Sequence, residues 1–147
     1  MMTYKIAVFN GPNLNLLGTR EPETYGHDTL ATIEKRCHQT GESCGATIEF
    51  FQTNHEGELI DRIQACRGKA DAIVLNAAAW THTSVAIRDA VTAVNLPLYE
   101  VHITNVHKRD AFRHHSFLSD VSVGVICGFG IQGYEYAIRQ AVVNLKK

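Results

Sequence analysis

The first residues suited to chemistry are a cation and a phenol, Arg20 and Tyr25, within the segment 10–26. That segment follows the apolar run 6–9 and precedes an amphipathic run, so it joins a strand to a helix, and a connection this long is usually functional or disordered. A tyrosine at its ordinary pKa is only about 0.1% phenolate at pH 7. A cation nearby favours the phenolate, which makes the phenol a usable base. We therefore expect an active-site lid, the alternative being a solvent loop in which the two residues are incidental.

A second group lies near position 100. His102 follows Glu100 at the end of another apolar run, and an imidazole there could donate a proton to a leaving group. The remaining candidates are groups that could bind substrate hydroxyls or an enolate and an arginine that could clamp a carboxylate: Asn13, Asn76, Thr104 and Arg113. Taken singly, each of these side chains could simply hydrogen-bond its own loop, so their significance depends on whether the fold brings them together.

Short apolar runs rich in β-branched residues alternate with longer amphipathic runs. Strands are expected at Lys5–Phe9, Thr47–Phe51, Ala72–Leu75, Pro97–Val101 and Val121–Ile126. Helices are expected from Leu30 to a stop at Gly45, from near Glu56 to before Gly68, over 87–94 before Asn95, and from Tyr134 to Leu145. This alternation predicts right-handed βαβ units and a parallel sheet. We expect an α/β, flavodoxin-like, doubly wound five-stranded sheet with helices on both faces, and one catalytic domain over residues 1–147.

The polar residues concentrate after the predicted strands. In open α/β sheets, ligands bind beyond the carboxyl ends of the strands. Amide, imidazole and guanidinium groups fill the segments that follow the five strands, which are 10–26, 52–57, 76–84, 102–116 and 127–133. The connections at the opposite edge, such as 67–70, are short and plain. This asymmetry predicts a small-molecule site at one edge of the sheet.

Several familiar sites are disfavoured by what the sequence lacks. No Gly-Lys-Ser/Thr ending follows the first strand, so a phosphate-binding P-loop is not indicated. Histidines are frequent, but no H-E-x-x-H occurs and acidic ligands are sparse, which disfavours a metal site. No Gly-x-Ser-x-Gly elbow occurs, and no lysine stands at an apolar strand end to form a Schiff base. Cys37, Cys44 and Cys66 fall in predicted helices and are expected to be buried thiols, and packing is favoured over a nucleophilic role for Cys127 at a strand end. Acid–base chemistry without a cofactor remains.

Composition narrows the class of protein. The 147 residues are 45% hydrophobic and 20% charged, with a net charge of −1, which gives no basic face for nucleic acid. No apolar run approaches the length of a membrane span, and the N-terminus lacks the apolar region of a signal peptide. We therefore expect a cytoplasmic protein that partners neither nucleic acid nor membrane.

The motifs together resemble a known family, the type II 3-dehydroquinate dehydratases of the shikimate and quinate pathways. The matching stretches span nearly the whole chain in order: 10–20 with Tyr25-Gly26, Asn54-His-Glu-Gly57, Thr81-His-Thr-Ser84, Glu100-Val-His-Ile103, Phe112-Arg-His-His-Ser116 and Gly124–Gly130. Several blocks in register are far more specific than any single one.

The resemblance implies a role for each matched catalytic position. Tyr25 corresponds to the general base that removes a proton from C2 of 3-dehydroquinate, and Arg20 to the lid arginine that favours its phenolate. Asn13 corresponds to the residue that holds a water or the enolate oxygen. His102 corresponds to the general acid that protonates the departing C1 hydroxyl, with Glu100 orienting it. The reaction implied is an anti elimination through an enolate to 3-dehydroshikimate, with neither a Schiff base nor a metal, and no cofactor.

The resemblance also implies binding residues and an assembly. The matched substrate-binding positions are Asn76, His82, Ile103, Thr104 and Arg113, the last for the carboxylate, and Asp89, which reaches a neighbouring subunit's site. The family is typically a homododecamer built as a tetramer of trimers. The chain departs from the family pattern in the segment 76–80, where Ala78 replaces a glycine and Trp80 a more usual tyrosine, and at Thr104, where serine is common.

The alternative from another class is a flavodoxin-like module that binds an anion or carries a signal without catalysis. A receiver module of that kind should show clustered acidic residues after the first strand and a lysine at a strand end. Here the first strand leads to Asn10-Gly-Pro12 and the last to Cys127-Gly128, which disfavours this alternative.

Overall fold

The computed structural model describes residues 3–19, 23 and 27–147, and within them it forms a five-stranded parallel sheet with helices on both faces. The strands are β1 (Tyr4–Asn10), β2 (Ala46–Gln52), β3 (Ala72–Asn76), β4 (Leu98–His102) and β5 (Gly124–Cys127). The helices are α2 (Leu30–Cys44), α3 (Glu56–Ala65), α4 (Val85–Val94) and α5 (Gln132–Leu145). The strand order β2-β1-β3-β4-β5 is the flavodoxin-like order, so the predicted fold class is confirmed.

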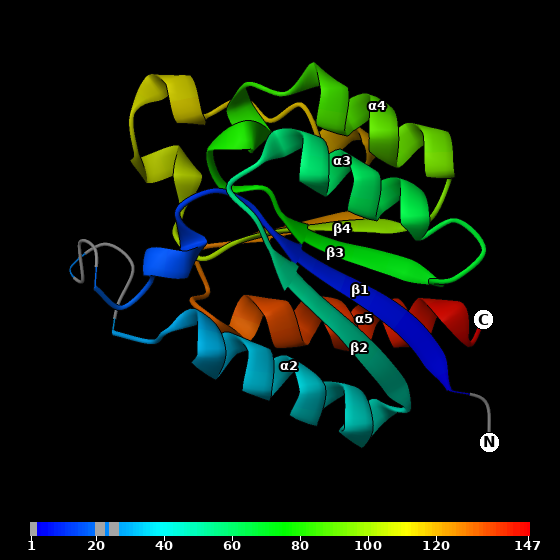
Figure 1. Ribbon diagram of the computed structural model, residues 1–147. Helices are drawn as coiled ribbons and strands as arrows, with labels where there is room; N and C mark the ends of the chain where they lie inside the picture. The colour runs from blue at the N-terminus through cyan, green and yellow to red at the C-terminus, as the bar shows by residue number, and fades with distance from the viewer. Residues whose placement is uncertain (1–2, 20–22, 24–26) are drawn as a thin grey trace.

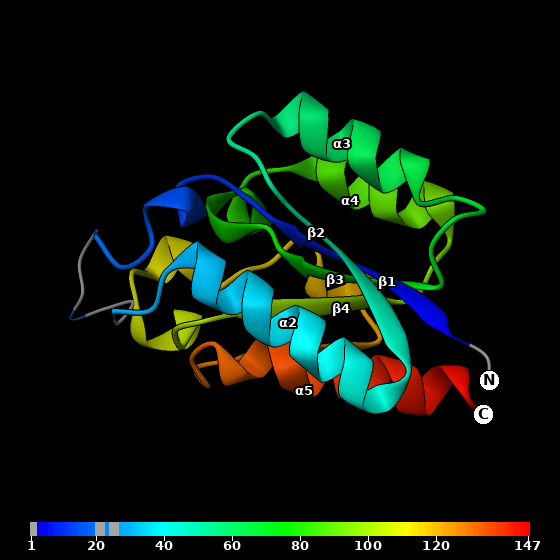
Figure 2. The same cartoon turned by 60° about the horizontal axis from the view of Figure 1, so that its bottom comes forward.

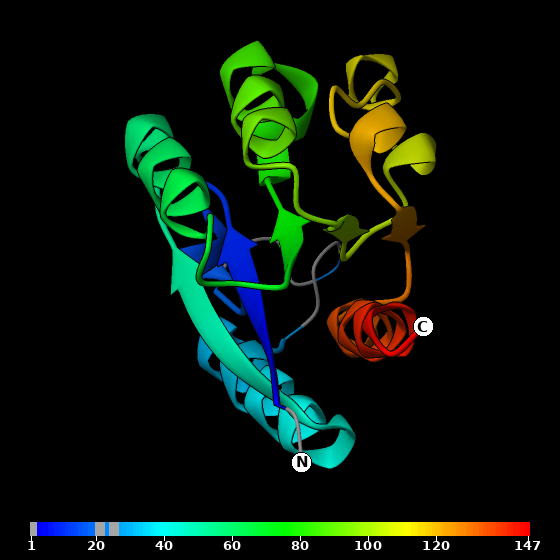
Figure 3. The same ribbon diagram turned by 90° about the vertical axis from the view of Figure 1, so that its right-hand side faces the viewer.

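Two apolar cores lie on the two faces of the sheet. Helices α2 and α5 cover one face and α3 and α4 cover the other, as Figures 1 and 3 show. Strand β1 supplies both cores, because successive side chains point to opposite faces: Ile6 and Val8 pack on the α2 side, Ala7 and Phe9 on the α3 side. Figure 2 brings α2 and α5 forward and shows them side by side beneath the sheet.

The helix limits follow local signals that the sequence displays. Helix α2 begins after Thr29, whose hydroxyl accepts a hydrogen bond from the Thr32 amide at 3.2 Å, and ends at Gly45, whose φ is +86°. Helix α4 begins after Ser84, which caps the Ile87 amide at 2.9 Å, and ends at Asn95 in the left-handed conformation. No helix in the described part of the chain is long and apolar enough to cross a membrane.

The last strand is shorter than the sequence predicts. The expected strand began at Val121, but Ser119–Val121 is a short 3₁₀ helix and β5 begins only at Gly124. The hydroxyl of Ser122 donates to the Leu118 carbonyl at 2.7 Å, which holds this turn closed. Val121 is partly buried against the α3–α4 core, so its apolar character reflects a packed turn and not a strand.

The carboxyl ends of the strands meet at one edge, at the left of Figure 1, where the segment after β1 touches the end of β3 and the segment that follows it. The Gly11 amide donates to the Asn76 carbonyl at 2.8 Å, which ties the segment after β1 to the end of β3. A Cβ added at Gly11 would lie 2.3 Å from the carbonyl oxygen of Ala77. Only glycine allows this approach of two backbones.

We predict that Gly11→Ala destabilises the fold by about 1–3 kcal/mol, because the backbone of the segment after β3 must move to admit the methyl group. Urea unfolding at equilibrium measures the change. The matched control is Gly57→Ala in the first turn of α3, where a Cβ meets nothing within 4 Å. The control should be neutral or slightly stabilising. Equal stabilities of the two variants would contradict the close approach.

Candidate active site

The centre of the site is a histidine paired with a buried carboxylate on β4. Glu100 and His102 are two residues apart on one strand, so their side chains point to the same face. Nε2 of His102 lies 2.5 Å from Oε2 of Glu100, and the side chains of His102 and Glu100 are 6% and 1% exposed respectively. With Nε2 engaged by the carboxylate, Nδ1 is the ring nitrogen left for a substrate.

Two serine hydroxyls complete the surroundings of the carboxylate. Ser116 donates to Oε2 of Glu100 at 2.8 Å and Ser119 donates to Oε1 at 2.6 Å. Burial alone would raise the pKa of the Glu100 carboxyl, but the hydrogen bonds from His102, Ser119 and Ser116 outweigh it, and the pKa lies below its ordinary value. Glu100 is therefore an anion near neutral pH, and it fixes the orientation of the imidazole.

A second imidazole lies against the first. The rings of His82 and His102 are nearly parallel, with centroids 6.5 Å apart and planes inclined by 18°. Nδ1 of His82 lies 2.8 Å from the His115 carbonyl, which can only accept, so Nδ1 carries the proton. Burial lowers the pKa of His82, and the nearby charges of His102 and Arg113 act in the same direction. A neutral His82 therefore presents the lone pair of Nε2 as an acceptor.

The segment after β1 supplies an amide on the opposite side. Asn13 has a φ of +71°, a left-handed conformation that asparagine tolerates better than most residues. Its backbone amide donates to Oδ1 of Asn54 at 2.9 Å, and Nε2 of Gln52 donates to the Gly11 carbonyl at 3.1 Å. These contacts tie the segment to the end of β2.

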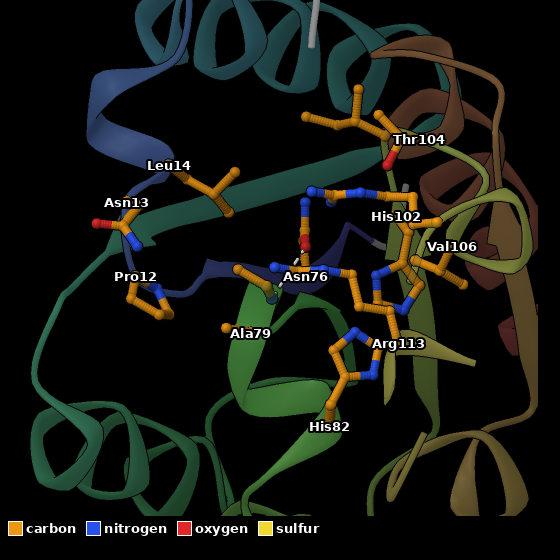
Figure 4. Close-up of a pocket in the computed structure, with 13 residues that line it drawn as sticks. Pro12, Asn13, Leu14, Asn76, Ala79, His82, His102, Thr104, Val106 and Arg113 are labelled. Carbon is orange, nitrogen blue, oxygen red and sulfur yellow. Dashed lines mark hydrogen bonds between the residues drawn. The ribbon is translucent and has the colours of Figure 1, made fainter. Parts of the chain in front are cut away.

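These groups surround a cavity of about 120 Å³ at the carboxyl edge of the sheet (Figure 4). It is lined by Pro12, Asn13, Leu14, Asn76, Ala78, Ala79, His82, His102, Ile103, Thr104, Val106, Arg109 and Arg113. Figure 4 shows Pro12 and Asn13 on one side, His102 and Arg113 on the other, and Asn76 between them. The lining combines donors, acceptors and two cations with apolar side chains, which suits a small polar molecule that carries an anionic group.

Arg113 is the cation best placed for an anionic group. Its Nε is buried and has no hydrogen-bond partner among the described residues, since Oδ2 of Asp110 lies 3.8 Å away. A planar guanidinium with unused donors matches a carboxylate. Arg109 also lines the cavity, and the sequence reasoning did not single it out. Its only signal was its place in the basic segment that follows β4.

Most of the predicted site residues meet at this cavity. Seven line it: Asn13, Asn76, His82, His102, Ile103, Thr104 and Arg113. Glu100 lies behind His102. Asp89 is exposed on α4 and does not line the cavity of this chain. Arg20 and Tyr25 lie outside the described residues.

Two further predictions concern metals and thiols. Among the described residues, no cluster of three or more His, Cys, Asp or Glu side chains could hold a metal ion. Cys37 and Cys66 are buried thiols, and burial raises their pKa to about 12 and about 11 respectively, which makes them poor nucleophiles. Cys44 and Cys127 are half-buried, so the expectation of buried thiols at Cys37, Cys44 and Cys66 is right for two of the three. Cys127 does not line the cavity.

A family model described as dehydroquinase class II matches residues 4–142. The chain belongs to this family. The 3-dehydroquinate dehydratase 2 of Pseudomonas putida is 62% identical over 133 residues, which are 90% of this chain and 89% of that protein. The catabolic 3-dehydroquinase 1 of Fusarium vanettenii is 55% identical over 144 residues, which are 98% of this chain and all of the relative. The crystal structure of the type II dehydroquinase from Butyrivibrio crossotus superposes with a TM-score of 0.92 at 42% identity, covering 95% of this chain and 97% of that one.

The low pKa of Glu100 in this dehydroquinase-family site predicts a pH-dependent stability. A carboxyl whose pKa is lower in the folded than in the unfolded chain stabilises the fold fully above the unfolded-state pKa, about 4.3 for Glu. That contribution is lost as the pH falls through the folded-state pKa. The melting temperature of Glu100→Gln should therefore lie below that of the wild type at pH 7, and the gap should narrow at pH 3.

The control for this measurement is Glu42→Gln on the exposed face of α2. Its melting temperature should follow the wild type at both pH values. A gap for Glu100→Gln that stays constant from pH 7 to pH 3 would show that the carboxylate charge does not stabilise the fold.

Proposed function

We propose that the chain is a 3-dehydroquinate dehydratase, which eliminates water from 3-dehydroquinate to give 3-dehydroshikimate. One observation carries the proposal: the Glu100–His102 pair opens on a cavity that also presents the guanidinium of Arg113 and two amides, in a chain of the dehydroquinase family. The two relatives described above are named for this activity, and the match with this chain covers nearly the whole length of each.

The chemistry asked of the site follows from the substrate. 3-Dehydroquinate is a cyclic ketone with a hydroxyl group β to its carbonyl and a carboxylate. The ketone acidifies the C2 proton, so a base can remove it to leave an enolate, and the enolate then expels the C1 hydroxyl as that oxygen takes up a proton. One proton and one hydroxyl leave as water, and no oxidant or group acceptor is required. The protein must supply a base, an acid, an anchor for the carboxylate and stabilisation of the enolate.

His102 is the proposed acid. Its Nε2 is held by Glu100, so delivery of a proton to the leaving hydroxyl falls to Nδ1. An imidazolium at this position has its charge countered by an anion that Ser116 and Ser119 keep in place. Glu100 thus orients the ring, as a buried carboxylate does beside a catalytic histidine in other enzymes.

The binding residues divide by their chemistry. Arg113 is assigned to the carboxylate, because its Nε is buried without a partner in the described structure. Neutral His82 offers an acceptor to a substrate hydroxyl, and Asn76, Ile103 and Thr104 line the cavity beside it. Asn13 is assigned to the enolate oxygen or to a water that contacts it. Arg109 is added to this set on its position alone.

The base and its activating cation are proposed from the family resemblance. Tyr25 is assigned as the base that takes the C2 proton and Arg20 as the cation that favours its phenolate. Neither belongs to the described residues, and Asn13 and Leu14 of the same connecting segment line the cavity. A base from this segment would face the acid on β4 across the cavity, which is the arrangement an anti elimination needs.

The wider biology is proposed on the same basis. We assign residues 1–147 to one catalytic domain, acting in the cytoplasm in the shikimate route to chorismate and the aromatic amino acids. A homododecamer arranged as a tetramer of trimers is the proposed assembly, in which exposed Asp89 on α4 reaches a neighbouring subunit's site. No metal or other cofactor is assigned.

The direct test is an absorbance assay for the conjugated enone of 3-dehydroshikimate, using purified protein and 3-dehydroquinate. We expect absorbance to rise in proportion to protein concentration and to persist after treatment with a chelator. No rise above the rate without protein would overturn the dehydratase assignment and leave the anion-binding module as the better interpretation.

Tyr25→Phe should lower kcat by about 10²–10⁴-fold, the usual contribution of a positioned base, while binding of the substrate changes little. The absorbance assay measures kcat, and isothermal titration calorimetry measures substrate binding. Tyr136→Phe is the control, because its hydroxyl is exposed on α5 and donates only to Gln132, at 3.2 Å. A near-normal kcat in Tyr25→Phe would place the base elsewhere.

A further inference from the structure

A chain of hydrogen bonds runs beneath the cavity from one backbone group to another. The amide of Ala78 donates to Oδ1 of Asn76 at 3.1 Å, and Nδ2 of Asn76 donates to the hydroxyl of Tyr134 at 2.8 Å. That hydroxyl donates to Oδ1 of Asn10 at 2.6 Å, and Nδ2 of Asn10 donates to the Phe51 carbonyl at 3.2 Å. The chain joins the ends of β2, β1 and β3 to helix α5.

The direction of every bond in this chain is determined by its ends. The Phe51 carbonyl can only accept, so Asn10 must turn its Nδ2 towards it and its Oδ1 towards Tyr134. The hydroxyl proton of Tyr134 is then committed to Asn10, and its oxygen can only accept from Asn76. The Ala78 amide can only donate, which requires Oδ1 of Asn76 on that side. Both ends therefore select the same orientation of the Asn76 amide.

The three side chains that form this row of hydrogen bonds are buried. Tyr134 and Asn10 are fully buried, and Asn76 is 3% exposed. Burial raises the pKa of the Tyr134 hydroxyl, and the hydrogen bond from Asn76 offsets this only in part. Tyr134 is thus a neutral hydroxyl near pH 7, with no exposed surface from which to act on a substrate. Any influence it has on the reaction must pass through Asn76, which lines the cavity.

We propose that Tyr134 is a positioning residue of the active site, whose hydroxyl fixes the amide of Asn76 so that its second N–H serves as a donor to the substrate. Without the hydroxyl, the Asn76 side chain would be held only by the Ala78 amide, and a substrate would have to order it on binding. The expected effect on kinetics rests on the proposed dehydratase function. The ordering of the Asn76 side chain is a property of the protein without substrate and can be measured independently.

Tyr134→Phe keeps the ring and removes the hydroxyl. We expect KM for 3-dehydroquinate to rise about tenfold, the effect of losing one well-oriented hydrogen bond, with kcat changing by less than about twofold. The matched control is Tyr99→Phe. Tyr99 is 4% exposed, and its hydroxyl accepts a hydrogen bond from Nδ2 of Asn144 at 2.8 Å, away from the cavity. The control should lose comparable thermal stability and keep the wild-type KM.

A double-mutant cycle tests whether the effect passes through Asn76. In an Asn76→Ala background, Tyr134→Phe should change KM no further, because the side chain that it orients is gone. An unchanged KM in Tyr134→Phe, an equal rise in Tyr99→Phe, or full additivity with Asn76→Ala would each overturn the proposal. Should Tyr134→Phe fail to fold, Asn10→Ala breaks the same chain one bond further on and should give the same rise in KM.

A measurement on the free protein separates this proposal from the proposed function. The side-chain amide hydrogens of Asn76, followed by NMR, should exchange slowly with water in the wild type and in Tyr99→Phe, and faster in Tyr134→Phe. Unchanged exchange would overturn the positioning role even in an active enzyme. A wild type without dehydratase activity would overturn the proposed function, and the exchange measurement would still decide whether Tyr134 orders Asn76.

Discussion

The site depends on keeping one carboxylate charged inside the protein. Glu100 is 1% exposed, and an unpaired anion at that depth would cost far more than the fold could recover. Its two oxygens are satisfied by the His102 ring and by the hydroxyls of Ser116 and Ser119. This requirement explains why the long segment after β4 returns to the strand it left. The same contacts that make the charge tolerable hold the imidazole at the cavity.

The part of this segment that carries Ser119 is held in place by Arg88 on helix α4. Arg88 on α4 pairs with Asp120, and its guanidinium also donates to the Phe117 carbonyl at 2.8 Å, on either side of Ser119. Ser119, whose hydroxyl supports Glu100, therefore lies between two residues that contact helix α4. An exposed ion pair of this kind contributes little to stability by itself. Its consequence is the position of Ser119, which in turn supports the geometry of the Glu100–His102 pair.

The sequence predicts those features that follow from short-range periodicity and from the rule for strand ends. Alternation along β4 places Glu100 and His102 on one face, and the parallel sheet gathers Asn13, Asn76 and Arg113 at one edge. Contacts between distant segments have no such signal. Tyr134 fits the apolar stripe of α5 so well that its hydroxyl, which reaches Asn76 58 residues earlier in the chain, could not be anticipated. The strand predicted to begin at Val121 begins only at Gly124, because an apolar, β-branched residue is equally suited to a partly buried turn.

Backbone strain also collects at the cavity. In the described part of the chain, three non-glycine residues have positive φ, and two of them, Asn13 and Ala78, line the cavity, whereas Asn95 ends a helix. Ala78, at a φ of +53°, stands where the resembled family has glycine, and a left-handed alanine costs roughly 1–2 kcal/mol. Its amide is the first donor of the buried chain through Asn76 and Tyr134, so the network that orders the substrate-facing amide also holds the strained residue. A strained turn persists only when its surroundings over-determine it. Buried hydrogen bonds and the close approach at Gly11 supply that determination here, because they hold the turn at Ala78 and the Asn76 amide in one arrangement beside the cavity.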